Sequence, residues 1–121
     1  MIELMQDLPD KVLGFSASGK VTGDDYEQVL IPAVEAKLKA HPKVRLLYHL
    51  GAAFEGFEAE ALWDDAKVGM HHLNDWERIA VVTDTGWIRG AVKVFGFAMP
   101  GRIRTFADDE LAQAKDWISE S

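Results

Sequence analysis

Five side chains near the middle of the chain could form a small-molecule binding site. They are His49, Phe54, Phe57, Asp84 and Trp87. Small-molecule pockets combine a mostly apolar lining with a few polar groups that fix the orientation of the ligand. Aromatic rings together with an imidazole and a carboxylate match that mixture. We therefore take these five residues as candidate ligand-binding residues for a small apolar or amphipathic molecule.

The polar pair in this set has two other interpretations. His49 and Asp84 could act as general acid and base in a small enzyme, provided that their side chains approach within hydrogen-bond reach, directly or through one water. A structural interpretation is simpler: Asp84 caps a helix, His49 is an ordinary strand residue, and Phe57 and Trp87 cover the end of a sheet. Because helix caps and core aromatic residues are commoner than ligand sites, this interpretation stays open.

Other kinds of site lack the residues that they need. Gly51 and Gly56 resemble the glycines of a phosphate-binding loop, but Phe57 follows where that loop requires a lysine. His71 and His72 are adjacent, so on a helix their side chains diverge by about 100° and do not easily share a metal ion. No serine lies in a nucleophile-elbow motif, and the chain contains no cysteine. We predict no catalytic residue, no metal ion and no cofactor.

The candidate residues must be positioned by strands and helices that alternate along the chain. Apolar or alternating segments predict strands at residues 2–6, 11–20, 44–50, 78–84 and 103–107. Helical spacing of apolar residues predicts helices between Thr22 and Leu38, between Glu58 and Leu73, and after Thr85 and Asp108. We expect one α/β domain over residues 1–121: an open, mostly parallel five-stranded sheet with an N-terminal antiparallel hairpin and about four helices, in the order ββαβαβαβα.

The first predicted helix contains both a strong start signal and a proline. Thr22 is a good N-cap residue. Asp24 and Asp25 follow it, and their negative charges stabilise a helix N-terminus. Pro32 lies further along the same helical pattern. Because proline lacks an N–H and its ring clashes with the preceding turn, we expect a kink or irregular first turns.

This topology would bring the candidate residues to one edge of the sheet. His49 ends one central strand and is followed by the loop 51–57, whereas Asp84 and Trp87 follow the next strand. The carboxyl ends of parallel strands share an edge, and ligands of open α/β sheets bind there. The sequence thus predicts an apolar pocket with two polar groups at that edge.

A second candidate surface lies on the third predicted helix and the turn after it. It comprises Arg89, Lys93, Val94, Phe97 and Met99. The segment is too apolar for a fully solvated helix end, and such a patch marks either a protein interface, including a homodimer, or peripheral contact with a membrane. The competing interpretation is that Phe97 and Met99 pack under the following loop.

Composition restricts the classes of partner. The formal net charge of -7 should repel nucleic acid and anionic lipid at long range, so we expect no nucleic-acid partner. The N-terminal segment has no secretory signal pattern, and no apolar stretch approaches the roughly 20 residues that span a bilayer. With no cysteine, the chain matches a reducing cytoplasm. We expect a cytoplasmic protein, and we keep peripheral membrane association as a hypothesis.

Several segments carry a family resemblance. They are GKVTGDDYEQVLIPAVE, RLLYHLGAAFEGFEAEALWDDAKVG, RIAVVTDTGWIR and FGFAMPGRIRTF. Together they cover nearly the whole chain, which resembles the SpoIIAA-like family, a branch of the STAS/Sec14-related fold group. The resemblance implies an α/β domain of that fold. It implies a regulatory binding module, as STAS relatives are, or a lipid-binding module, as Sec14-like relatives are.

One functional feature of the wider group does not carry over. Its anti-sigma factor antagonists are switched by phosphorylation of a serine in the loop after a central strand. The corresponding segment here, Gly51–Phe57, contains no serine or threonine, so we predict no phosphorylation site. The preferred hypothesis is a non-enzymatic module that binds an apolar or amphipathic ligand, and the alternative is a protein-interaction module without a ligand.

Overall fold

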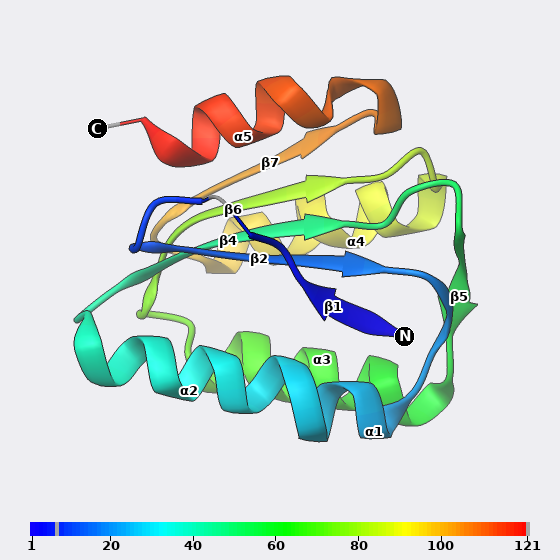
Figure 1. The fold of residues 1–121 in the computed structure, drawn as a ribbon, viewed down its shortest axis with the longest axis horizontal. Coiled ribbons are helices and arrows are strands. Elements are labelled where there is room, and N and C mark those ends of the chain that lie inside the picture. The colour runs from blue at the N-terminus through cyan, green and yellow to red at the C-terminus, as the bar shows by residue number, and fades with distance from the viewer. Residues whose placement is uncertain (7, 121) are drawn as a thin grey trace.

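A five-stranded sheet forms the centre of the molecule in a computed structural model that describes residues 1–6 and 8–120 (Figure 1). The strand order is β1-β2-β4-β6-β7. The strands are β1 (Ile2–Leu4), β2 (Val12–Ala17), β4 (Val44–His49), β6 (Trp76–Val82) and β7 (Arg102–Phe106). β1 pairs with β2 antiparallel, and the remaining pairs are parallel. The predicted mostly parallel sheet with an N-terminal hairpin is confirmed.

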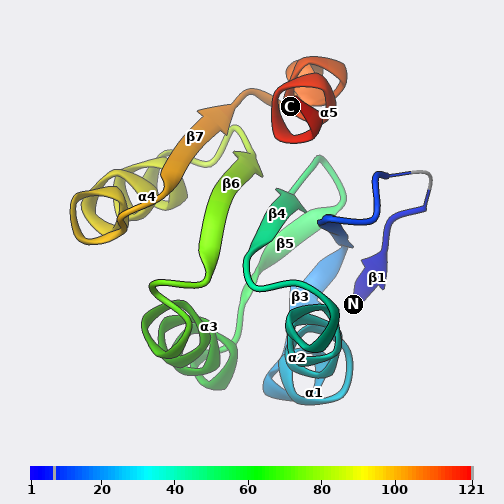
Figure 2. The ribbon, with the colours of Figure 1, turned by 90° about the vertical axis from the view of Figure 1, so that its left-hand side faces the viewer.

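Helices cover both faces of this sheet (Figure 2). They are α1 (Gly23–Asp25), the π-helical turn η1 (Tyr26–Leu30), α2 (Ile31–Ala40), α3 (Ala59–His71), α4 (Gly86–Ala98), the 3-10 turn η2 (Asp108–Glu110) and α5 (Leu111–Ser119). Val34 of α2, Ala61 of α3 and Ile88 of α4 share the larger apolar core on one face. Trp117 and Ile118 of α5 belong to a smaller core on the other face.

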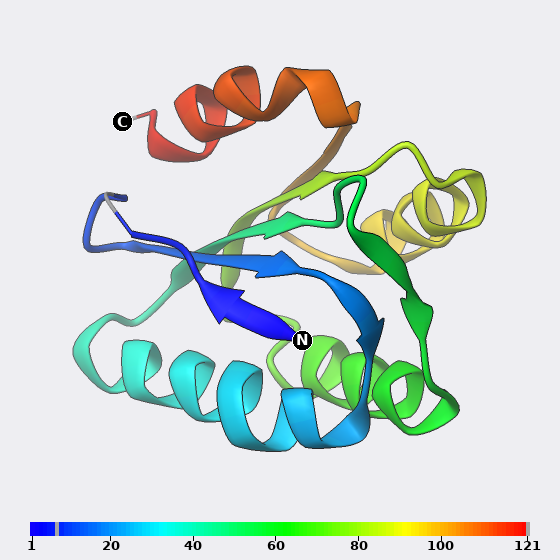
Figure 3. The same ribbon diagram turned by 45° about the vertical axis from the view of Figure 1, so that its right-hand side comes forward.

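A short second sheet lies beyond the end of the main one, and sequence patterns did not indicate it. β3 (Gly19–Val21) pairs in parallel with β5 (Phe54–Phe57), which runs past the end of the main sheet toward α3 (Figure 3). The single strand predicted over residues 11–20 is therefore two strands. The predicted loop 51–57 contains a strand that includes Gly56, whose φ of 129° favours glycine.

The irregularity expected at Pro32 lies just before it. Pro32 occupies the first turn of α2, where its missing N–H costs little. The turn η1 precedes it, and the N–H of Ile31 donates to the carbonyl of Tyr26, five residues back. The chain thus accommodates the proline with a wider turn and directs Tyr26 into the core, where its side chain is fully buried.

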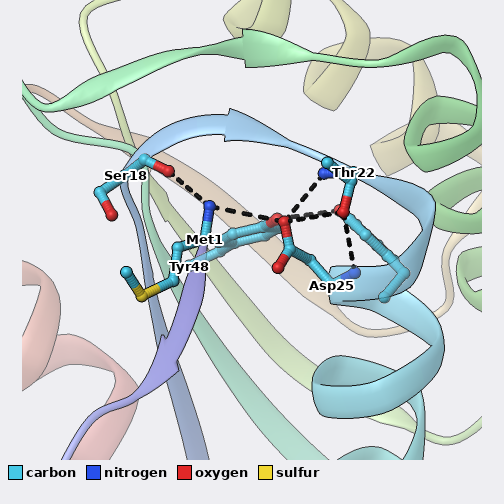
Figure 4. A network of polar contacts seen from close by, with 6 residues as sticks. Met1, Ser18, Thr22, Asp25 and Tyr48 are labelled. Carbon is cyan, nitrogen blue, oxygen red and sulfur yellow. Dashed lines mark hydrogen bonds and ion pairs between the residues drawn. The ribbon is translucent and has the colours of Figure 1, made fainter.

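The start of α1 is fixed by the expected cap at Thr22 (Figure 4). The backbone N–H of Asp25 donates to Oγ1 of Thr22 over 3.2 Å, and the N–H of Thr22 donates to Oδ2 of Asp25 over 2.9 Å. The α-ammonium of Met1 lies 3.4 Å from the same carboxylate oxygen and donates to the carbonyl of Ser18. Burial alone would raise the pKa of Asp25, but these donors outweigh it and leave that pKa lowered.

Candidate functional site

A groove of about 450 Å³ opens between α3 and α4, two helices that lie on the same side of the sheet (Figure 2). Its floor is the sheet, represented by Leu46 and Tyr48 of β4 and by Ile79 and Val81 of β6. One wall is α3, with Leu62, Ala66, Gly69 and Met70. The other wall is α4, with Ile88, Ala91, Val92 and Phe95. This volume lies within the range of small-molecule sites.

Helical periodicity explains why both walls are apolar toward the groove. Leu62, Ala66 and Gly69 recur at spacings of three and four residues on α3, as Ile88, Ala91 and Phe95 do on α4. Ala and Gly at these positions keep the helices from filling the space between them. The groove is therefore created by small residues set among large apolar ones.

Asp65 is the one carboxylate in the described lining of the groove. Its Oδ1 accepts a hydrogen bond of 2.7 Å from the hydroxyl of Tyr26. The hydroxyl of Tyr48 lies 2.9 Å from that of Tyr26. An ionised carboxylate can only accept hydrogen bonds, so the proton of Tyr26 points to Asp65 and the proton of Tyr48 points to Tyr26. These three residues form a polar relay, and Tyr48 and Asp65 connect it to the apolar groove.

Burial raises the pKa of all three members of the relay. Burial raises the pKa of Asp65, and the hydrogen bond from Tyr26 opposes part of that rise. Burial likewise raises the pKa of Tyr26 and of Tyr48 well above the usual tyrosine value. Although Asp65 lies deep among neighbouring atoms, its surface is open to the groove, so water or a ligand can reach the carboxyl group there.

The aromatic candidates lie together at one end of the groove. The rings of Phe54 and Phe57 are 4.9 Å apart between centroids, and those of Phe57 and Trp87 are 6.1 Å apart, both in edge-to-face geometry. Phe57 and Trp87 line the groove, and Trp87 remains 55% exposed at its mouth. Phe54 packs behind Phe57 and is not part of the lining.

The polar candidates lie elsewhere on that edge of the sheet. Neither His49 nor Asp84 belongs to the lining of the groove. Oδ1 of Asp84 accepts a hydrogen bond of 3.0 Å from the N–H of Asp108 at the start of η2. The ring of His49 lies against Gly51, where an added Cβ would come within 2.7 Å of Nε2. Within residues 1–6 and 8–120, no hydrogen bond joins His49 to Asp84, so the direct contact required of an acid–base pair is not made.

Asp84 thus caps the turn η2, a role close to the structural interpretation of this residue, but on a different element. The expected cap of α4 is not formed by a side chain, since Thr85 holds the N-cap position without such a bond. Burial raises the pKa of Asp108, and the neighbouring negative charge of Asp84 adds to that rise.

The relay is the part of the site that sequence reasoning missed. Asp64 and Asp65 are adjacent on α3, but Asp64 is buried with Oδ2 unpartnered, whereas Asp65 lines the groove. Asp65 falls at helical spacing from Leu62 and Gly69, but Asp64 falls equally at helical spacing from Ala61 and Val68, so spacing alone does not distinguish the two.

Only part of the predicted interaction surface is exposed in the structure. Phe97 is 93% exposed and Val94 is 72% exposed, whereas Met99 is only 6% exposed and belongs to the core. The expectation of an exposed Met99 is therefore wrong: α4 ends at Ala98, and the chain turns Met99 inward beneath it. Arg89 donates to the carbonyl of Thr83 over 3.0 Å and helps to fix the start of α4.

The described part of the chain lacks two further features. No cluster of three or more His, Cys, Asp or Glu side chains there could hold a metal ion. Among the helices of residues 1–6 and 8–120, none combines the length and the apolar character that crossing a membrane requires.

The strand order and the helix arrangement define an α/β protein with the SpoIIAA-like fold. The sequence model of the SpoIIAA-like family matches residues 12–119, nearly the whole chain. The chain belongs to the SpoIIAA-like family, and the expected family is confirmed. No curated protein matches this sequence. The fold suggests a regulatory module without enzymatic activity.

A solved structure supports this assignment. It is an uncharacterized protein of the DUF3478 family with a SpoIIAA-like fold, from Shewanella loihica PV-4. The two proteins are 28% identical, and the match covers 98% of this chain and 92% of that one with a TM-score of 0.76.

Proposed function

We propose that this protein is a non-enzymatic regulatory module that binds a small apolar or amphipathic molecule in the groove between α3 and α4. The observation that supports the proposal is the groove itself, about 450 Å³ in volume and lined almost entirely by apolar side chains. An open apolar groove of this size gains free energy when an apolar chain displaces its water.

A ligand would enter the groove past Trp87 and Phe57. Trp87 is half-exposed at the mouth and Phe57 lies inside the groove, so an apolar molecule would contact both rings. His49 and Asp84, the other candidates, would lie outside this contact. A bound molecule would change the environment of Trp87, and of Trp76 in the lining, which makes tryptophan fluorescence a direct measurement.

The test uses decanol, a neutral amphiphile, with binding followed by tryptophan fluorescence and by native mass spectrometry. Ala91→Phe adds a ring to the α4 wall of the groove and is expected to weaken decanol binding by about tenfold or more, because it fills the space a ligand needs. Ala112→Phe on α5 adds the same ring away from the groove and should leave binding unchanged. Equal binding by both variants, or no binding by the natural protein, contradicts the proposal.

A second candidate function rests on the exposed side chains of α4. Phe97 and Val94 present a patch that does not contribute to the core, which favours contact with a protein partner, a second copy of the chain or a membrane surface. Phe97→Ser should abolish self-association in analytical ultracentrifugation or binding to zwitterionic vesicles. A monomer that binds neither vesicles nor a partner protein in pull-down assays contradicts this function.

A further inference from the structure

The groove contains one polar position that an apolar ligand would leave unused. Asp65 lies among apolar lining residues, and the described part of the chain offers it no ion pair: the salt bridges there involve Asp10, Asp25, Asp75, Glu77 and Glu120 instead. A carboxylate in apolar surroundings is costly unless it is paired and hydrogen-bonded. The relay supplies part of that compensation, and the rest has to come from water or from a ligand.

The geometry leaves one carboxylate oxygen of Asp65 for that ligand. Oδ1 accepts the hydrogen bond from Tyr26. Among the hydrogen bonds of residues 1–6 and 8–120, none goes to Oδ2, although the residue is accessible from the groove. Oδ2 is thus a hydrogen-bond acceptor in the lining of an apolar groove.

We propose, on the basis of the proposed groove function, that the ligand is an amphiphile with a primary ammonium head group, which donates a hydrogen bond to Oδ2 of Asp65 while its apolar tail lies between α3 and α4. Three properties of the site support this class. Tyr26 donates to Asp65 and Tyr48 donates to Tyr26, and this chain of donors stabilises a negative charge on Asp65. The lining offers that charge no cation of its own. The tail would contact Leu62, Ala91 and Phe95.

The charge of the head group distinguishes this class from other amphiphiles. An ammonium group makes charge-assisted hydrogen bonds, which are roughly twice as strong as neutral ones, so it should bind better than a hydroxyl group. A carboxylate would face Asp65 with a like charge and should bind worst. The net charge of -7 adds a long-range attraction for cations.

The experiment compares decylamine, decanol and decanoate, which share a tail and differ in the head group, all below their micelle concentrations. Alkyl ammonium groups resemble lysine, with a pKa of about 10.4, so decylamine is cationic at neutral pH. We expect the natural protein to bind decylamine about tenfold more tightly than decanol, and decanoate more weakly than either.

Two variants locate the effect. Asp65→Asn keeps an oxygen acceptor for Tyr26 but removes the charge, and it should lose the preference for decylamine while binding decanol as before. Glu35→Gln removes one charge from the exposed side of α2 and should keep the preference. Unfolding curves of both variants check that the fold persists, and the comparison of the three head groups on the natural protein needs no variant.

The outcomes separate the two proposals. Equal affinities for decylamine and decanol, or the same loss of preference in Glu35→Gln, overturn the head-group inference and leave the groove function intact. No binding of decanol and of decylamine overturns the groove function and the inference together. Tight decylamine binding that Asp65→Asn abolishes selectively supports both.

Discussion

The hydroxyl of Tyr26 donates a hydrogen bond of 2.7 Å to Asp65, a residue 39 positions away in the sequence. This bond joins the π-helical turn η1 to α3, one wall of the groove. The hydroxyl of Tyr48, on the central strand β4, forms a hydrogen bond of 2.9 Å with the hydroxyl of Tyr26. The polar relay therefore holds together a helix wall, a strand of the floor and the turn behind them.

Removal of the Tyr26 hydroxyl should destabilise the protein. Tyr26→Phe leaves Oδ1 of Asp65 and the hydroxyl of Tyr48 each without a partner, and we expect a loss of about 1–3 kcal/mol in the free energy of unfolding. Urea unfolding of this variant, of Tyr48→Phe and of the double variant measures the coupling. Simple additivity of the two single effects would show that the hydroxyls do not act together.

The helix cap at Thr22 offers a matched comparison. Thr22→Ala removes the Oγ1 acceptor that binds the N–H of Asp25, so we expect a loss of about 0.5–2 kcal/mol in stability. Thr85 occupies the N-cap position of α4 without a side-chain cap bond, and Thr85→Ala should cost less. Thermal or urea unfolding of both variants is the measurement, and similar losses would contradict the assigned role of Thr22.

Glycine substitutions test how closely two segments approach. A Cβ at Gly101 would lie 2.4 Å from the carbonyl oxygen of Trp76 and 2.8 Å from that of Glu77, so Gly101→Ala should be strongly destabilising. A Cβ at Gly90, in the middle of α4, meets no atom within 4 Å. We expect Gly90→Ala to be neutral or to stabilise by up to about 1 kcal/mol, because alanine favours helix. A reversed order in unfolding experiments would contradict the packing of β6 against the turn before β7.

The pH dependence of stability should reveal the contact between Arg45 and Glu77. Nε of the buried Arg45 donates to Oε1 of Glu77 over 2.5 Å, and this bond lowers the pKa of Glu77 below its ordinary value of 4.5. A carboxyl group with a lowered pKa in the folded state adds stability above the unfolded-state pKa, and this contribution is lost as pH falls through the folded-state pKa.

We therefore expect Glu77→Gln to be less stable than the natural protein at neutral pH, with the difference shrinking below about pH 4.5. Denaturant unfolding at a series of pH values measures this change. Glu120, which is exposed and lies 3.6 Å from Arg78, provides a control, because Glu120→Gln should show a smaller difference. A difference for Glu77→Gln that does not vary with pH contradicts the assignment.

The fold could be predicted because its main elements carry strong patterns. The continuous apolar run over 44–50 indicates a strand covered on both faces, and the helical spacing of α3 indicates one buried side. β3 and β5 escaped prediction because they are short and contain glycines, and their pairing depends on a contact between distant segments. Local patterns do not encode such pairing.

The candidate site could likewise be predicted only in part. Phe57 and Trp87 could be placed at one edge because each follows a parallel strand, and their rings do meet there. Asp65 could not be assigned a role, because Asp64 and Asp65 are adjacent and the sequence leaves open which one faces the groove. The rotation of α3 against η1 decides that question, and it depends on packing between separate elements.

The π-helical turn η1 determines which directions the side chains of α2 face around the helix axis. An α-helix rotates by about 100° for each residue, and a turn that encloses one residue more delays that rotation by a comparable angle. Tyr26 and the residues beyond Pro32 are therefore offset around the helix axis, which lets Tyr26 reach Asp65 while Val34 packs beneath the sheet. Deletion of the exposed Gln28 would restore an ordinary phase, and Tyr26 and Val34 could then no longer keep their present orientations together.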